Sequence, residues 1–166
     1  MTTMKPPMNM DGFGRRISYL RISLTDHCNL RCLYCMPNKE QAFGPDEELL
    51  TAQEIQTVVS AAARLGFDKI RLTGGEPTLR HDLVDIVRRI KTVDGINEVT
   101  MTTNGLLLHR FADDLAAAGL NRVNIHVDTF NATHAKDLMR LDNLEQVQAG
   151  IRAAENAGFS PIKLNV

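Results

Sequence analysis

The chain has 166 residues, of which 43% are hydrophobic and 23% are charged. A chain of this length can bury roughly 70% of the surface that its unfolded form exposes, which is enough for one domain with a sizeable core. Its formal net charge of −1 excludes a general attraction to nucleic acid or to an anionic membrane. We therefore expect no nucleic-acid or membrane partner, and any bound anion has to be held by a few placed cations.

The N-terminal segment, residues 1–14, mixes Pro, Met, Gly and Asn without a period and predicts a flexible arm. This segment lacks the apolar core of a signal peptide, and nowhere does the sequence hold the roughly 18 consecutive apolar residues of a membrane span. These features predict a cytoplasmic protein in a reducing compartment. Residues 15–166 are expected to form the ordered domain.

Strand-like and helical segments alternate along that domain. The predicted strands span residues 17–25, 68–75, 97–105, 121–129 and 161–166. The predicted helices span residues 51–66, 80–95, 109–119 and 143–158, and a short connector at 130–142 can form another helix. At the start of the first helix, Thr51 and Glu54 have the Ser/Thr-x-x-Glu spacing of a capping box.

Three segments repeat one unit, in which a helix end is followed by a glycine, a large apolar residue and a strand. The glycines are Gly66, Gly119 and Gly158. Glycine adopts the left-handed conformation that commonly ends a helix, and the following apolar residue packs back on the last turn. Strands that alternate with helices predict parallel pairing and right-handed crossovers, hence an α/β sheet with helices outside.

Polar residues follow successive predicted strands: the cysteine-containing stretch, then "TGGEP", "TTNG" and "HVDT". Parallel barrels build their sites from the carboxyl ends of several strands, whereas the glycine fingerprint of a dinucleotide-binding sheet is missing after the first strand. Five strands are fewer than the eight of a complete barrel. We therefore expect a partial parallel (β/α) barrel, the first part of a larger one.

Every cysteine of the chain lies in the stretch "DHCNLRCLYCMP", at Cys28, Cys32 and Cys35. An odd number of clustered cysteines in a reducing compartment favours metal binding over disulfides. Three thiolates leave one iron of a four-iron cluster without a protein ligand, so that iron can bind a substrate. Two alternatives stay open: a zinc site with His27 as the fourth ligand, and three unliganded buried cysteines.

The cysteine spacing, with Tyr34 just before the third cysteine, resembles the signature of radical S-adenosylmethionine (SAM) enzymes. The stretch "GGEP" (Gly74 to Pro77) matches the second motif of those enzymes. The stretches "DGFGRRISYLRISLTDHCNLRCLYCMP", "IRLTGGEPTLR", "TTNGLLL" and "IKLNV" are similar to the N-terminal part of the GTP 3′,8-cyclase family of molybdenum cofactor biosynthesis. The similarity runs from about Asp11 to Val166.

The resemblance implies a [4Fe-4S] cluster on Cys28, Cys32 and Cys35, whose open iron binds the amino and carboxylate groups of SAM. Reductive cleavage of SAM then gives a 5′-deoxyadenosyl radical, which starts the cyclisation of GTP to (8S)-3′,8-cyclo-7,8-dihydroguanosine 5′-triphosphate. The family's enzymes carry a second three-cysteine [4Fe-4S] site near their C-terminus, and these residues do not contain it. The chain alone is therefore expected to bind the first cluster weakly and not to cyclise GTP.

The resemblance also implies roles for individual residues. The candidates for binding SAM are Tyr34, Gly74, Gly75, Glu76 and His126, although relatives commonly have Ser at the last position. The candidates for binding GTP are Arg21, Arg71, Thr102 and Lys163. The three cations among them sit mid-strand, where a long charged side chain favours a polar cavity, and the alternative is that they point outward into solvent. Asn104 and Asp128 lie at strand ends and could support this site.

Two other functions stay open at this point: a peptide-modifying or maturase radical SAM enzyme, and a zinc-binding module without catalysis. The resemblance implies an electron-donor protein and, downstream, the cyclic pyranopterin monophosphate synthase as partners. The resemblance is also compatible with a homodimer.

Overall fold

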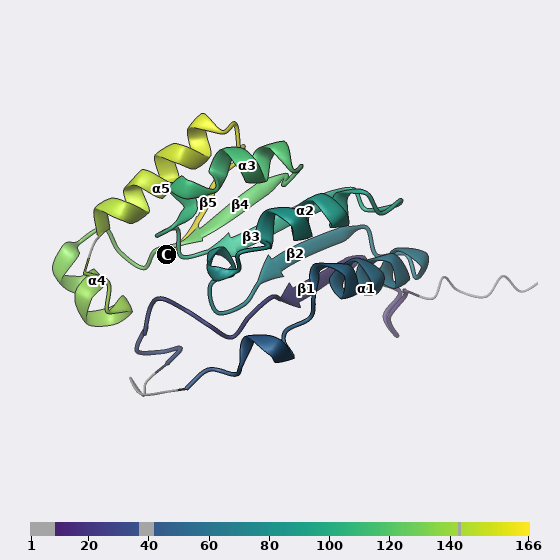
Figure 1. The fold of residues 1–166 in the computed structure, drawn as a ribbon, viewed down its shortest axis with the longest axis horizontal. Helices are drawn as coiled ribbons and strands as arrows, with labels where there is room; N and C mark the ends of the chain where they lie inside the picture. The colour runs from purple at the N-terminus through teal and green to yellow at the C-terminus, as the bar shows by residue number, and fades with distance from the viewer. Residues whose placement is uncertain (1–8, 37–41, 143) are drawn as a thin grey trace, which may run out of the picture.

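The computed structural model describes residues 9–36, 42–142 and 144–166. Its centre is a five-stranded parallel sheet in which the strands follow one another in sequence order (Figure 1). The strands are β1 (Tyr19–Ser23), β2 (Lys69–Thr73), β3 (Glu98–Thr103), β4 (Arg122–His126) and β5 (Lys163–Asn165). The helices are α1 (Ala52–Arg64), α2 (Leu83–Lys91), α3 (Ala112–Ala117), α4 (Ala132–Met139) and α5 (Leu144–Asn156), with 3-10 turns η1 (Asp46–Glu48), η2 (Pro77–Leu79) and η3 (Leu108–Arg110).

The helices α1, α2, α3 and α5 cover one face of the sheet (Figure 1). Between the sheet and these helices lies the apolar core, whose strand residues Ile70, Leu72 and Ile125 are fully buried. From the helix side, Ile86 of α2 and Leu115 of α3 are equally buried in this core. The predicted α/β architecture, a partial barrel with helices outside, is confirmed.

The opposite face of the sheet carries polar side chains, because successive strand residues point to opposite sides. We call this side the inner face and define it by Arg21, Arg71, Thr102, Asn124 and Lys163. Strand register places Arg21 beside Arg71, Thr102 beside Asn124, and Asn124 beside Lys163. The inner face therefore collects on neighbouring strands the residues that are scattered along the sequence.

The repeated helix-end unit has the predicted conformation at all three glycines. The φ angles are +94° at Gly66, +98° at Gly119 and +83° at Gly158, so each backbone is left-handed. The residue after each glycine donates its backbone N–H to a carbonyl five residues earlier, as from Phe67 to Ala62. This hydrogen-bond pattern ends each helix and turns the chain directly into the next strand.

The capping box at the start of α1 is also present. The backbone N–H of Glu54 donates to Thr51 Oγ1 at 3.3 Å, and the backbone N–H of Thr51 donates to Glu54 Oε2 at 2.8 Å. Most elements are a few residues shorter than predicted.

Residues 1–8 of the predicted arm lie outside the described part of the chain. Residues 9–14 form a turn, and Met10 pairs with Arg16 in an isolated antiparallel bridge. Asn9 Nδ2 donates to the carbonyl of Gly66 at 3.1 Å, which attaches this segment to the end of α1. The flexibility of residues 1–14 as a whole stays a prediction. No described helix has the length and apolar character needed to cross a bilayer.

Candidate functional site

A cavity of about 380 Å³ opens at the carboxyl end of the sheet. Its walls come from the loop after β1, the loop after β2, and the ends of β3 and β4. Apart from Thr73, Thr103 and Leu30, the lining consists of Arg21, Cys28, Cys32, Tyr34, Cys35, Gly74, Gly75, Glu76, Thr102, Asn104 and His126. The structure thus brings together all three cysteines, every residue predicted for SAM, and two of the four predicted for GTP.

The three cysteines are free thiols on one loop. Cys28 and Cys32 are half-buried, and burial raises the pKa of both thiols above the ordinary value of 9.0. Cys35 is exposed to the cavity. Within the described residues, no three ligand-type side chains converge closely enough to hold a single metal ion. In a four-iron cluster each thiolate binds a different iron, so the three sulfurs can lie farther apart than the ligands of a single metal ion.

The paired glycines bring two loops into contact. A Cβ atom on Gly74 would lie 2.6 Å from the carbonyl oxygen of Thr25, and one on Gly75 would overlap the carbonyl of His27. The backbone N–H of Gly75 donates to Thr25 at 2.7 Å, and that of Glu76 donates to His27 at 2.7 Å. These glycines therefore let the "GGEP" loop pack against the start of the cysteine loop, which fixes both loops at the cavity.

Glu76 is a buried carboxylate with several hydrogen-bond donors. Its Oε1 accepts from the Thr103 hydroxyl at 2.6 Å and from the Thr78 hydroxyl and backbone, while its Oε2 accepts from the backbone of Asn104 at 2.7 Å. The residue is 1% exposed. Glu76 therefore joins the "GGEP" loop to the end of β3, a structural role that the sequence left undecided.

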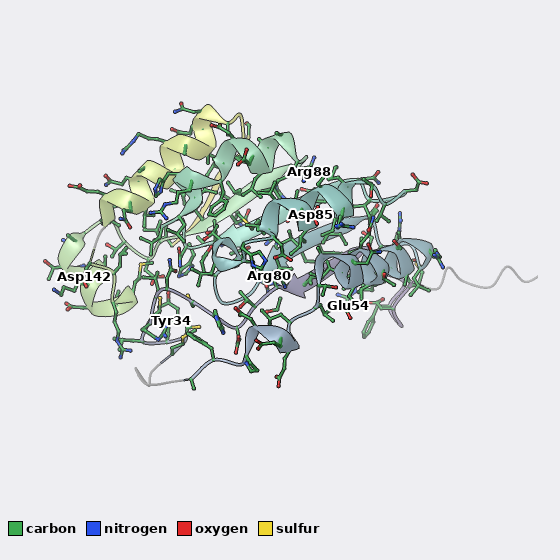
Figure 2. The ribbon with its side chains drawn as sticks, in the orientation of Figure 1. Tyr34, Glu54, Arg80, Asp85, Arg88 and Asp142 are labelled. Carbon is green, nitrogen blue, oxygen red and sulfur yellow. The ribbon has the colours of Figure 1, made fainter. Side chains whose placement is uncertain are left out.

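Tyr34 joins the cysteine loop to the end of β4. Its hydroxyl lies 2.6 Å from His126 Nε2 and 2.7 Å from Asp128 Oδ2, and His126 Nε2 lies 3.1 Å from Asp128 Oδ1. Burial and the neighbouring Asp128 carboxylate raise the pKa of the Tyr34 phenol, which therefore stays protonated. Figure 2 shows Tyr34 at the same end of the molecule as α4, far from Glu54 on α1.

Asn29 is a site residue that the sequence argument missed. Its Oδ1 accepts from Asn104 Nδ2 at 2.7 Å, so the cysteine loop is also bonded to the loop after β3. Its position inside the cysteine spacing was the available signal. Asn104 itself was predicted as a supporting residue, and its place at the cavity agrees with that role.

His27 lies on the other side of the cysteine loop. It lines a separate cavity of about 270 Å³ together with Asp46, Thr51, Arg80 and other residues, and none of the cysteines reaches that cavity. Its Nε2 lies 2.8 Å from the carbonyl of Gly44, and its ring packs on Phe43. The described geometry therefore gives no support to a zinc site made of the three cysteines and His27.

The inner face continues from the cavity along the strands. Arg21 and Thr102 line the cavity itself, whereas Arg71 and Lys163 lie beyond its wall on the same face. Arg71 Nε donates to Thr100 Oγ1 at 3.3 Å, and its guanidinium lies 5.3 Å from the centre of the Tyr19 ring. Lys69, which the sequence argument did not single out, occupies the same face two residues before Arg71.

Comparison with known proteins assigns this arrangement to a family. The sequence model of the Radical SAM superfamily matches residues 22–166, which is most of the chain. The chain belongs to the radical SAM superfamily.

Two curated relatives are closely similar to this radical SAM chain. It is 51% identical to the GTP 3′,8-cyclase of Peptoclostridium acidaminophilum over 94% of its own length and 48% of the relative's. It is 49% identical to the GTP 3′,8-cyclase of Lactiplantibacillus plantarum over 94% of its own length and 47% of the relative's. The chain thus spans about half the length of these relatives.

Solved structures confirm the fold alone. Methylornithine synthase (PylB) superposes with a TM-score of 0.70 at 19% identity, over 88% of this chain and 43% of that one. Streptococcus suis SuiB bound to the precursor peptide SuiA superposes with a TM-score of 0.71 at 18% identity, over 90% of this chain and 32% of that one.

Membership of the radical SAM superfamily implies a [4Fe-4S] cluster and SAM as cofactors. The residues present fit this pair of groups. Three free thiols face one cavity from a single loop, and two of them are shielded enough to raise their pKa values. Beside them lie polar and backbone groups of three further strand ends, as a cofactor with amino, carboxylate and sugar groups requires.

Proposed function

We propose that this chain is the N-terminal part of a GTP 3′,8-cyclase. The sequence identity of about half with two cyclases over nearly the whole chain supports this proposal. The observation that carries it is the unpaired positive charge of the inner face. Among the described residues, no carboxylate forms an ion pair with Arg21, Arg71 or Lys163.

Cations that lack a carboxylate partner suit an anionic substrate. Arg21 lies beside Arg71 on the neighbouring strand, so two guanidinium groups can approach one polyphosphate. Arginine presents a planar fork that matches phosphate oxygens, and its charge does not depend on pH in the working range. In this proposal Arg21, Arg71 and Lys163 bind the triphosphate of GTP. Thr102, whose buried Oγ1 has no partner within the described residues, hydrogen-bonds the nucleoside.

The cysteine loop and the strand ends position the cofactors. Cys28, Cys32 and Cys35 would hold the cluster, which together with SAM supplies an electron and a 5′-deoxyadenosyl radical when both are bound. Tyr34 and His126 would contact the adenosine part of SAM. The "GGEP" loop, residues 74–77, would place backbone carbonyls near its amino group. The protein's own contribution is orientation and the exclusion of water and oxygen.

The proposed function also predicts where the protein works and which proteins it works with. We place the protein in the cytoplasm, where free thiols persist. An electron-donor protein and a downstream synthase that consumes the cyclised nucleotide are partners that this function requires.

The direct test is the formation of 5′-deoxyadenosine by the full-length protein after anaerobic cluster reconstitution. We expect formation to depend on added GTP. Arg71→Ala should raise the KM for GTP by at least about tenfold, since a hydrogen-bonded charge contact contributes about 1.5 to 3 kcal/mol. Arg64→Ala, on the exposed last turn of α1, is the matched control and should leave the KM unchanged. SAM cleavage that ignores GTP and requires a peptide would replace the proposal with a peptide-modifying function.

A further inference from the structure

The contacts at the mouth of the cavity constrain where the protons lie. Tyr34, His126 and Asp128 make three mutual contacts of 2.6, 2.7 and 3.1 Å, and each contact needs a proton between its two atoms. The phenol supplies one proton and can accept one. The Asp128 carboxylate only accepts. The imidazole therefore has to supply the proton that the other two contacts share.

Only one neutral tautomer of His126 satisfies all three contacts. With a proton on Nε2, the ring donates to both the Tyr34 oxygen and Asp128 Oδ1, while Tyr34 donates to Asp128 Oδ2. Without that proton, the Nε2 lone pair would face Asp128 Oδ1 at 3.1 Å, and two acceptors would repel each other. Asp128 thus fixes the tautomer of His126 by accepting a hydrogen bond from Nε2–H, as carboxylates commonly do for histidines.

The fixed tautomer determines what His126 offers to a ligand. In the uncharged ring, the other nitrogen, Nδ1, is left as an acceptor, and among the described residues it has no hydrogen-bond partner. His126 lines the cavity that the cysteines share. A complementary ligand group has to be a donor, such as a sugar hydroxyl or an exocyclic amino group.

We propose that Asp128 is a positioning residue that fixes His126 in the Nε2–H tautomer, so that His126 Nδ1 accepts a hydrogen bond from the adenosyl moiety of SAM. Asp128 also holds Tyr34, so one carboxylate orders both side chains at the mouth of the cavity. The identity of the ligand rests on the proposed function. The tautomer rests only on the geometry of the three side chains.

The first experiment measures the tautomer without any cofactor. Long-range proton–nitrogen NMR spectra of the protein labelled with ¹⁵N-histidine, recorded before cluster reconstitution, distinguish Nε2–H from Nδ1–H. The His126 signal is assigned by its loss in His126→Ser. We expect the Nε2–H form, and we expect Asp128→Ala to convert it to a mixture of tautomers. An Nδ1–H ring in the unchanged protein would overturn the inference, whatever the enzyme's activity.

The second experiment measures equilibrium binding of SAM to the anaerobically reconstituted full-length protein. We expect Asp128→Ala to weaken binding about three- to tenfold, the value of one hydrogen bond. In a background that carries both His126→Ser and Tyr34→Phe, the same change should alter the dissociation constant less than about twofold, because both side chains that Asp128 positions have lost their hydrogen bonds to it. Asp113→Ala, on the exposed surface of α3, is the control and should bind SAM normally.

The two experiments separate the two ideas. An equal loss of SAM affinity from Asp128→Ala in both backgrounds would overturn the positioning role. Unchanged affinity in Asp128→Ala would do the same. If the wild-type protein carries its cluster but does not bind SAM, both the proposed function and SAM as the ligand of His126 are wrong. The NMR result would still decide the tautomer of His126.

Discussion

Glu76 shows how a residue in a recognised motif can act on the fold rather than on a ligand. Its carboxylate is buried and accepts from Thr78, Thr103 and Asn104, so it holds two loops of the cavity together. A carboxylate with this many donors is satisfied only as an acceptor. Glu76 therefore holds the cavity in its shape without any help from a cofactor.

We expect Glu76→Gln to lower the free energy of unfolding by about 2 kcal/mol, because the amide NH₂ would face donors and leave them unsatisfied. Chemical denaturation of the cluster-free chain measures this value. Glu48→Gln, on an exposed 3-10 turn, is the matched control and should change stability by less than about 0.5 kcal/mol. Equal stability of the two variants would show that the buried hydrogen bonds of Glu76 contribute nothing.

The sequence predicted which residues form the site better than it predicted which of them contact one another. The cysteines, Tyr34 and Gly75 could be found because their spacing is local. The Tyr34 contacts with His126 and Asp128 span 92 and 94 residues, and no pattern in one sequence pairs such distant positions. Glu76 was left undecided for the same reason, since its partners come from a different strand end.

At the scale of elements, α5 packs on the turn after β3 through a helix position without a side chain. A Cβ atom on Gly150 would overlap the carbonyl oxygen of Gly105 and lie 3.3 Å from Leu108 Cβ. Glycine in a helix interior ordinarily lowers helix stability relative to alanine. Here the close approach of two backbones outweighs that propensity.

We therefore expect Gly150→Ala to destabilise the chain by about 1 to 3 kcal/mol through overpacking, although alanine is the better helix former. Thermal or chemical unfolding measures the change. Gly12→Ala is the control, because a Cβ atom there meets nothing within 4 Å. A Gly150→Ala protein as stable as the control would contradict the packing described for α5.

Arg80 anchors the segment between η2 and α2. Its guanidinium pairs with both oxygens of Asp82 and donates to the carbonyls of Leu24 and Leu50. Burial alone would raise the pKa of Asp82, but the Arg80 contacts outweigh it and hold that pKa below the ordinary value of 3.8. The contribution of the Asp82 carboxylate to the free energy of unfolding is therefore fully present above pH 3.8. It is lost as the pH falls through the lower pKa that Asp82 has in the folded chain.

We expect Arg80→Met to lower the free energy of unfolding by about 2 to 3 kcal/mol at pH 7. The difference from the unchanged chain should shrink below pH 3.8, where Asp82 is protonated in the unfolded state and then in the folded one. Urea titrations at several pH values measure both quantities. Arg88→Met, whose side chain is exposed on α2 (Figure 2), is the control, and a pH-independent loss in Arg80→Met would contradict the pairing.

The elements themselves were largely predictable. Helix ends were marked by glycines that the structure places in the left-handed region, and the start of α1 was marked by the capping box. Strand boundaries were predicted too long, since Gly74, Gly75 and Asn104 were taken into the strands but follow β2 and β3 as loop residues that line the cavity. Local patterns give the type of each element, whereas its last residues depend on neighbours from other strands.

At the scale of the whole molecule, one sheet separates two chemical environments. Helices bury its apolar side chains on one face, and the inner face presents cations and hydroxyls that run on from the cysteine cavity. The sequence predicted this division from the polar residues at strand ends and from the charges within strands. It could not show that Arg21 reaches the cavity while Lys163 lies on the edge strand, because that follows from strand order and register.

The central claim is that three cysteines of one loop hold an iron-sulfur cluster beside the SAM cavity. The most direct measurement is the iron, sulfide and zinc content of this chain after anaerobic reconstitution, with Cys28→Ala, Cys32→Ala and Cys35→Ala combined as the comparison. The account predicts about four iron and four sulfide per chain, lost in the triple variant. One zinc without iron, or the same iron content in the triple variant, would contradict it.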